Sequence, residues 1–142
     1  MKQILSIMLL ASLLFACQSS KKLAKNNIIQ DSHWTIYECK LQNPSSDKTP
    51  IHIQERAIIQ HLNNGRILLQ DSMVYLTTLK ETIDAKIIER HEDYLLIYDK
   101  KKQKEIKFPY ELDVKNKKCV FHLPGIDGQG EILLYSEQIP MP

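Results

Sequence analysis

The sequence lacks the short motifs that most often reveal a catalytic or phosphate-binding site. It has no Gly-x-Ser-x-Gly segment, which would set a nucleophilic serine on a strand-to-helix turn. The cysteines that follow Cys17 fall within strand patterns and not at such a turn. The glycine-rich segment 125–131 has neither the Lys-Ser or Lys-Thr pair of a phosphate loop nor enough oxygen ligands for calcium. We therefore expect a non-enzymatic protein in which this segment connects two strands.

Metal-binding spacings are missing as well. None of the five histidines stands in a His-x₃-His or carboxylate-His spacing, and there is no Cys-x₂-Cys pair. We predict no metal site and no cofactor, and we expect the histidines to be exposed or singly hydrogen-bonded. They are His33, His52, His61, His91 and His122.

A strong charge bias is also absent. The formal net charge is +2, so nothing in the overall balance favours nucleic acid as a partner. Lysines do gather locally, at Lys100, Lys101, Lys102, Lys104, Lys107, Lys115, Lys117 and Lys118. If their two turns lie at one end of the domain, they form a basic patch for an anionic partner such as lipid headgroups or an acidic protein surface. The alternative is a pair of solvated turns whose lysines discourage edge pairing.

The N-terminus has the features of an export signal. Lys2 precedes an apolar stretch, 4–15, that is too short to span a bilayer comfortably, and Ala16 precedes Cys17. The tail 14–17, Leu-Phe-Ala-Cys, resembles the lipobox of bacterial lipoproteins. The resemblance implies that residues 1–16 are removed and that the Cys17 thiol is lipidated. An ordinary cleaved signal or an uncleaved anchor is the alternative.

The residues after Cys17 indicate in which membrane such a lipoprotein is located. The resemblance to lipoproteins would place Asp after the cysteine for retention in an inner membrane, and this chain has Gln18. No acidic run follows, so we expect an outer-membrane lipoprotein that faces the periplasm, attached through lipid on Cys17. We expect 17–32 to be a flexible tether and 33–142 to be a single domain.

Lipidation of Cys17 leaves one pair of cysteines, Cys39 and Cys119. In an oxidising periplasm this pair could form a disulfide that closes a loop of roughly 80 residues and stabilises the domain by about 2–4 kcal/mol. Two independent buried thiols are the alternative.

Hydrophobic periodicity is mostly two along the domain, which is typical of strands. It predicts strands over 34–39, 94–98 and 106–112, and further strands near 119–123 and 132–135. Pro109 predicts an edge or a bulge in its strand, because proline cannot donate to a ladder.

Two segments are ambiguous. Residues 57–62 and 66–70 around Asn63-Asn64-Gly65 predict a hairpin with an Asn-Gly turn, and the rival is a helix over 54–62 capped near Gly65. Residues 72–91 predict two strands, near 73–79 and 84–90, with a single helix as the rival.

About eight short antiparallel strands in sequence order predict an all-β fold, a small up-and-down barrel, because closure removes exposed edges. A sandwich, or an α+β fold with a helix near 72–91, is the alternative. Trp34 at the first strand, the Asn63-Asn64-Gly65 turn and the block 85–98 resemble the small lipocalin-like domains of bacterial lipoproteins. The resemblance implies a barrel whose mouth holds a small apolar ligand, and it carries over no catalytic residue. The inward residues expected at the cavity are Trp34, Tyr98, Phe108, Tyr110 and Leu134.

A second resemblance suggests another role. Tyr37-Glu38-Cys39 near the start and Cys119 late in the chain are similar to periplasmic lipoproteins that inhibit lysozyme. The sequence thus leaves two functions in view, a module that binds a small apolar or amphipathic ligand and a module that binds an envelope protein. A purely structural envelope lipoprotein is the third reading.

Overall fold

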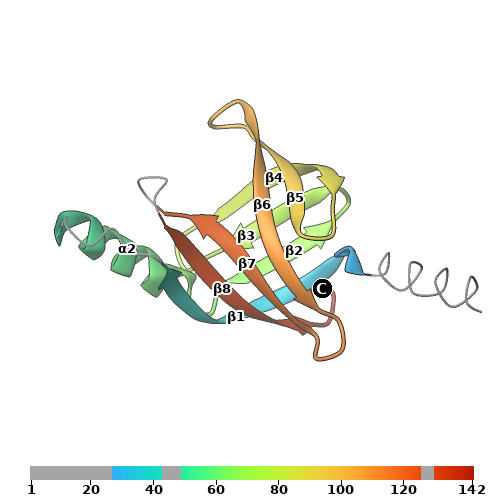
Figure 1. Ribbon diagram of the computed structural model, residues 1–142, viewed down its shortest axis with the longest axis horizontal. Coiled ribbons are helices and arrows are strands. Elements are labelled where there is room, and N and C mark those ends of the chain that lie inside the picture. Colours follow the sequence, from blue (N-terminus) through green and yellow to red (C-terminus); the bar gives the residue numbers. More distant parts are fainter. Residues whose placement is uncertain (1–26, 43–48, 126–129) are drawn as a thin grey trace, which may run out of the picture.

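The fold is a closed barrel of eight antiparallel strands in sequence order (Figure 1). A computed structural model of the chain describes residues 27–42, 49–125 and 130–142. Its elements are β1 (Ser32–Gln42), α2 (Thr49–Leu62), β2 (Arg66–Gln70), β3 (Met73–Thr77), β4 (Thr82–Arg90), β5 (Tyr94–Asp99), β6 (Lys104–Asp113), β7 (Lys118–Pro124) and β8 (Glu131–Ile139). β8 pairs with β1 and closes the ring, which confirms the predicted fold class.

Alternation along the strands sorts the side chains into a core and a surface. In β6, Phe108 and Tyr110 are buried while Lys107 and Glu111 are exposed. β1 departs from strict alternation, because the register with β8 shifts at a bulge between Ile36 and Glu38. Beyond the bulge Cys39 and Leu41 pack against the core, so Glu38, which strict alternation would place on the same face as Trp34, is exposed.

The predicted hairpin at 57–70 is wrong, because the rival helix forms. Asn64 takes a positive φ of 65°, which ends α2 in a left-handed residue and does not build a two-residue strand turn. Asn63 still donates to the Ile59 carbonyl at 3.0 Å, and Gly65 donates to that of Leu62 at 2.9 Å. A Cβ on Gly65 would lie 2.8 Å from two carbonyl oxygens, so only glycine fits there.

The two strands predicted within 72–91 are confirmed as β3 and β4. Asp71 and Ser72, between β2 and β3, have φ angles of 53° and 61°, the values of a tight type I′ hairpin turn. Apolar residues in this segment also have helical spacing, but β-branched residues favour strands. The strands form because each pairs with a neighbour on both sides in the closed sheet.

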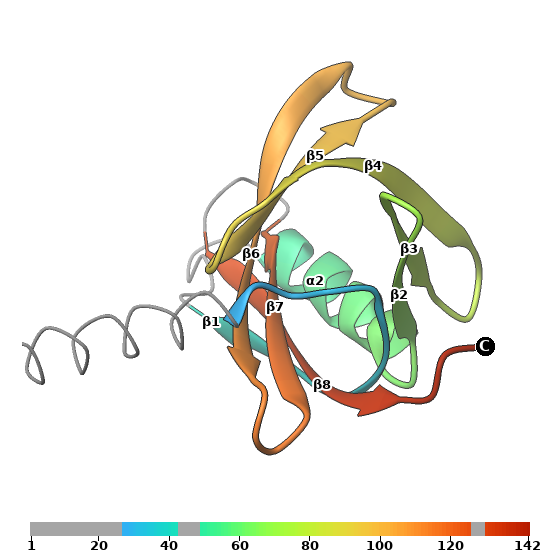
Figure 2. The same cartoon turned by 90° about the vertical axis from the view of Figure 1, so that its right-hand side faces the viewer.

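An up-and-down barrel places consecutive hairpin turns at opposite ends. We call "mouth" the end that carries the turns 78–81 and 100–103 and the β7–β8 connection, together with α2. We call "base" the end that carries the turns 71–72, 91–93 and 114–117, the N-terminal segment 27–31 and the C-terminus (Figures 1 and 2).

The base is packed shut. Trp34, Phe121 and Phe108 form a row of aromatic contacts, with ring centroids 6.0 Å and 5.5 Å apart. Figure 2 shows the N-terminal segment crossing the ring of strands at this end. Its Ile29 is 1% exposed, and its backbone amide donates to the Tyr110 hydroxyl.

Part of the predicted tether therefore belongs to the barrel. Ile29 and Ser32 are buried, whereas the sequence placed both in a flexible segment. Ile29 is an apolar residue within a polar stretch, which was a local signal for burial. Its partner, Tyr110, lies 81 positions further along the chain and could not be inferred from it. The predicted signal, 1–16, and the lipidation site, Cys17, fall outside the described residues.

Candidate functional site

The packing that fills the base does not extend to the mouth, where the barrel encloses a cavity of about 570 Å³. This volume lies within the range of roughly 300–1,000 Å³ that is usual for small-molecule sites. Its inner walls are apolar side chains from β3 to β7, namely Val74, Leu76, Ala85, Ile97, Ile106, Phe108 and Leu123. Ala85 stands beside Val74 in the β3–β4 pair, and its small side chain leaves the space open.

The rim of the cavity is charged. Lys100 Nζ lies 3.9 Å from Asp84 Oδ2 of the neighbouring strand β4. Asp99 Oδ1 accepts hydrogen bonds from the backbone amides of Lys101, at 2.9 Å, and Lys102, at 3.2 Å, and so orders the β5–β6 turn. An apolar interior beneath a charged rim suits a ligand that is apolar or amphipathic.

The five residues predicted at the cavity have different positions in the structure. Phe108 lines it. Trp34, Tyr110 and Leu134 face inward as expected, but each is at most 2% exposed in the packed core and is not among the residues that line the cavity. The prediction for Tyr98 is wrong, because Leu95 and Ile97 are the inward residues of β5 and Tyr98 faces outward.

The sequence did not single out most of the true lining residues. The face of β5 could not be assigned, since both sets of alternating residues are hydrophobic. Ala85 carried a usable signal, because it is a small residue at a buried strand position beside larger apolar ones. The N-terminal segment closes the base and leaves the mouth open. No local sequence pattern predicts at which end this segment packs.

The single basic patch predicted from two lysine-rich turns is wrong. Lys100, Lys101, Lys102 and Lys104 lie at the mouth, and Lys115, Lys117 and Lys118 lie at the base, because successive hairpins point to opposite ends. At the base, Lys118 Nζ lies 5.3 Å from the centre of the Tyr37 ring. The lysines near the cavity are therefore those of the β5–β6 hairpin alone.

The predicted disulfide is not formed, and Cys39 and Cys119 are free. Both pair with β8, but from opposite sides, Cys39 with Leu134 and Cys119 with Ser136. Two strand spacings amount to about 9.6 Å, beyond the roughly 7 Å limit for bridged Cα atoms. Burial raises the pKa of the Cys39 thiol to about 11, and it raises the pKa of Cys119 further. Both thiols are protonated at neutral pH.

Three histidines have polar partners, one each for His33 and His91 and two for His122, whose Nε2 also lies 3.7 Å from Glu111 Oε2. His33 Nδ1 lies 3.1 Å from the Pro140 carbonyl, His91 Nε2 lies 2.7 Å from Glu89, and His122 Nδ1 lies 2.9 Å from Glu131. Over the ranges that the structure describes, no three metal-binding side chains converge.

The wall of the barrel is incomplete between β6 and β7. Their register ends at Tyr110 and Phe121, although β5–β6 pairing continues to Lys104 and β7–β8 pairing continues to Pro124. The Tyr110 amide donates to Asp93 on the β5 side, so residue 109 directs its backbone toward β7, where Pro109 has no N–H to give. Of the edge or bulge that the sequence predicted at Pro109, the edge is found, because the β6–β7 pairing ends at Tyr110 and the two strands separate toward the mouth.

A second cavity, of about 380 Å³, lies against this opening. It shares Lys102, Ile106, Lys107, Leu123 and Pro124 with the inner cavity. Lys104, Pro109, His122, Gly130 and Glu131 complete its lining. The two cavities therefore meet at the gap between β6 and β7.

Comparison with protein families, curated proteins and solved structures gave no match to this chain. Of the helices in the described ranges, none has the length and apolar character needed to cross a membrane.

Proposed function

We propose that this chain is a lipid-anchored envelope lipoprotein that binds a small apolar or amphipathic ligand inside its barrel, without catalysing a reaction. The observation that carries the proposal is the apolar cavity of about 570 Å³ at the mouth. A barrel of this size could have packed its interior completely, as it does around Trp34 and Phe121.

The cavity walls supply the binding energy. Each CH₂ of a ligand that leaves water for this interior contributes about 0.8 kcal/mol. The packed base prevents passage through the barrel, because Ile29 and Tyr110 are each about 1% exposed. A ligand is therefore held in a closed-ended pocket.

The direction of the chain determines how an N-terminal lipid anchor would orient the barrel. The N-terminal segment joins the barrel at the base, opposite the mouth (Figure 1). If lipid on Cys17 anchors the chain to the outer membrane, the cavity lies at the end of the domain remote from the point of attachment. The mouth then faces the periplasm, where a ligand is delivered or collected.

The test compares a variant that fills the cavity with a matched surface variant. The protein is residues 17–142 with Cys17→Ser, secreted behind a cleavable signal, and the probe is dodecanoate in a calorimetric titration. Ala85→Phe places a ring in the cavity, and Ala57→Phe makes the same change on an exposed position of α2. We expect Ala85→Phe to abolish dodecanoate binding and Ala57→Phe to leave it unchanged. Native mass spectra checked for a co-purified small molecule give a second readout.

Absence of binding in the parent protein, with no small molecule in its native mass spectrum, would contradict the proposal. So would equal binding by both variants, because the ligand would then lie outside the barrel.

A second candidate function is binding of an envelope protein through the mouth. Leu79 and Ile83, on and after the β3–β4 turn, are 76% and 42% exposed and form an apolar edge there. This function predicts that the double variant Leu79→Ser, Ile83→Ser loses a partner that the parent cross-links in the periplasm. A cross-linking pattern that the double variant leaves unchanged would exclude this edge as the contact.

A further inference from the structure

The gap between β6 and β7 turns the closed-ended pocket into one with a side entrance. The last β6–β7 pair is Tyr110 with Phe121. From there toward the mouth, the remaining six residues of β6 and three of β7 are not paired with each other. Ile106 of β6 and Leu123 of β7 lie on the two sides of this gap and line both cavities. An alkyl chain can therefore run from the inner cavity to the outer one along a continuous apolar surface.

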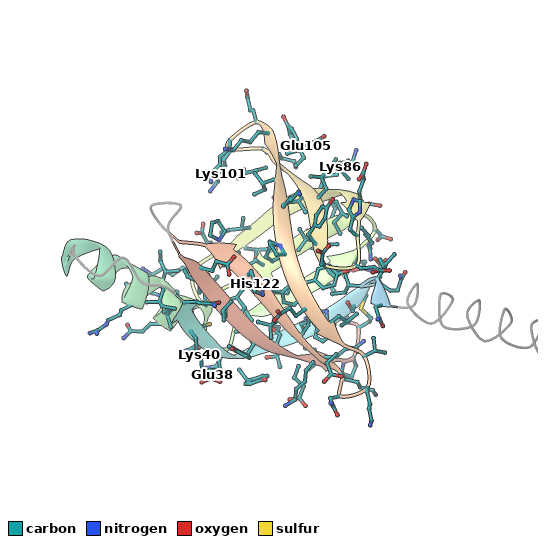
Figure 3. All side chains as sticks on the ribbon, viewed as in Figure 1. Glu38, Lys40, Lys86, Lys101, Glu105 and His122 are labelled. Carbon is teal, nitrogen blue, oxygen red and sulfur yellow. The ribbon has the colours of Figure 1, made fainter. Side chains whose placement is uncertain are left out.

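The outer side of the gap is basic. Lys102, Lys104 and Lys107 line the outer cavity, and Glu131 is the one carboxylate among the described residues of its lining. That carboxylate is already engaged, because Glu131 Oε2 lies 2.9 Å from His122 Nδ1. Figure 3 shows His122, which lies on β7 at this gap, on the outer face of the barrel.

Lys100, on the rim, has a carboxylate partner, whereas Lys101, also on the rim, has none among the described residues. Lys100 is 3.9 Å from Asp84, which offsets its charge. Among the described residues, Lys102 and Lys104 have no ion-pair partner, and Lys107 Nζ lies over the Tyr94 ring, 4.7 Å from its centre. The ammonium groups of Lys102 and Lys104, beside an apolar gap and without an ion-pair partner among the described residues, favour an anion at that place.

We propose that the ligand is a single-chain amphiphile with an anionic head group, carboxylate or phosphate. Its chain lies in the inner cavity, and its head lies outside the wall between β6 and β7, on Lys102, Lys104 and Lys107. The ligand thus enters and leaves through the side of the barrel and not across the rim. This inference rests on the proposed function, because it requires the inner cavity to hold the chain.

The experiment uses residues 17–142 with Cys17→Ser and three probes that share one alkyl chain: dodecanoate, dodecyl phosphate and dodecanol. The test variant is Lys104→Gln, Lys107→Gln, which removes two charges from the outer cavity. The control variant is Lys100→Gln, Lys101→Gln, which removes two charges from the rim of the inner cavity and none from the outer one.

We expect the parent to bind at least one anionic probe about tenfold more tightly than dodecanol, as one or two charge-assisted hydrogen bonds would give. The test variant should lose about that tenfold advantage and keep its affinity for dodecanol, whereas the control variant should keep the advantage. The tighter of the two anionic probes distinguishes a fatty acid from a phosphate-bearing lipid as the source of the head group.

Three results would each contradict a different part of the proposal. Equal affinity for dodecanol and both anions overturns the anionic head while the proposed function stands. Loss of the anion advantage in the control variant, and not in the test variant, moves the head to the rim and overturns the side entrance. Failure of all three probes to bind overturns the proposed function and this inference with it.

Discussion

The Tyr110 hydroxyl accepts a hydrogen bond from the Ile29 amide, at 3.1 Å, across 81 positions of sequence. The same hydroxyl donates to the His91 carbonyl, so it joins β6, the β4–β5 turn and the N-terminal segment at the base. Tyr110→Phe would leave the Ile29 amide buried without this partner, which costs about 1–3 kcal/mol. We expect the urea midpoint to fall accordingly, with faster exchange of the Ile29 amide. The control is Tyr37→Phe, on a side chain that is 47% exposed. Equal midpoints for the two variants would show that the base does not depend on this contact.

Period-two hydrophobicity was sufficient to predict the barrel, because in a closed antiparallel sheet each strand repeats the same inward and outward alternation. It failed at Asn63-Asn64-Gly65, where positive φ is compatible with both a hairpin turn and the end of a helix. Ile58 and Ile59 favoured a strand locally. A tertiary contact favours the helix over the hairpin, since the Asn64 amide donates to the Ile36 carbonyl of β1.

The candidate site was less predictable than the fold. Inward residues could be named, but Trp34 and Phe108 face the same interior and only the second reaches the cavity. The difference depends on how far Ile29 and its neighbours fill the base. The gap in the wall had one local signal, Pro109, and its position beside the cavity follows from the register of β6 with both neighbouring strands.

The Asp31–Arg90 ion pair, which also joins the N-terminal segment to the barrel, predicts a pH dependence. The hydrogen bond from Arg90 holds the pKa of Asp31 below its usual value. Its stabilisation is therefore complete above the unfolded pKa of about 3.9 and is lost as the pH falls through the lower folded pKa. Asp31 is 47% exposed, so Asp31→Asn should cost only about 0.2–1 kcal/mol at pH 7.

Urea unfolding of Asp31→Asn and the parent at pH 7 and pH 3 measures this difference, which should shrink at pH 3. The control is Glu38→Gln, which removes a surface pair with Lys40 at 3.5 Å and leaves the base intact. A difference that grows on acidification would contradict the assignment of a lowered pKa.

The two thiols should be unreactive in the folded chain. With the pKa of Cys39 near 11, its thiolate fraction at pH 8 is on the order of a hundredfold below that of a free thiol. In the Cys17→Ser protein, a disulfide reagent should react slowly under native conditions and should titrate two thiols once the chain is denatured without reductant. Comparison of Cys39→Ser with Cys119→Ser should assign the faster native reaction to half-buried Cys39. Detection of no thiol after denaturation would mean that the cysteines are bonded in the mature protein.

Pro109 should set the rate at which the ligand passes through the gap. Pro109→Val supplies an amide at the position that faces His122, so it can extend the β6–β7 ladder by one residue pair. One new hydrogen bond stabilises the folded state by about 0.5–1.5 kcal/mol. Removal of proline raises the conformational entropy of the unfolded chain, which offsets about 0.4–1 kcal/mol of this gain. Global stability should therefore change little.

The expected result for Pro109→Val is a new backbone amide at position 109 that is protected from hydrogen exchange, together with slower release of dodecanoate in stopped-flow displacement. Pro140→Val makes the same substitution beyond the end of β8, at the base, and should release dodecanoate at the parental rate. Release that stays at the parental rate in Pro109→Val, although the new amide is protected, would mean that the ligand leaves across the rim. The anionic head would then have to reach Lys104 and Lys107 over the β5–β6 turn, and the charge variants would no longer distinguish the outer cavity from the mouth.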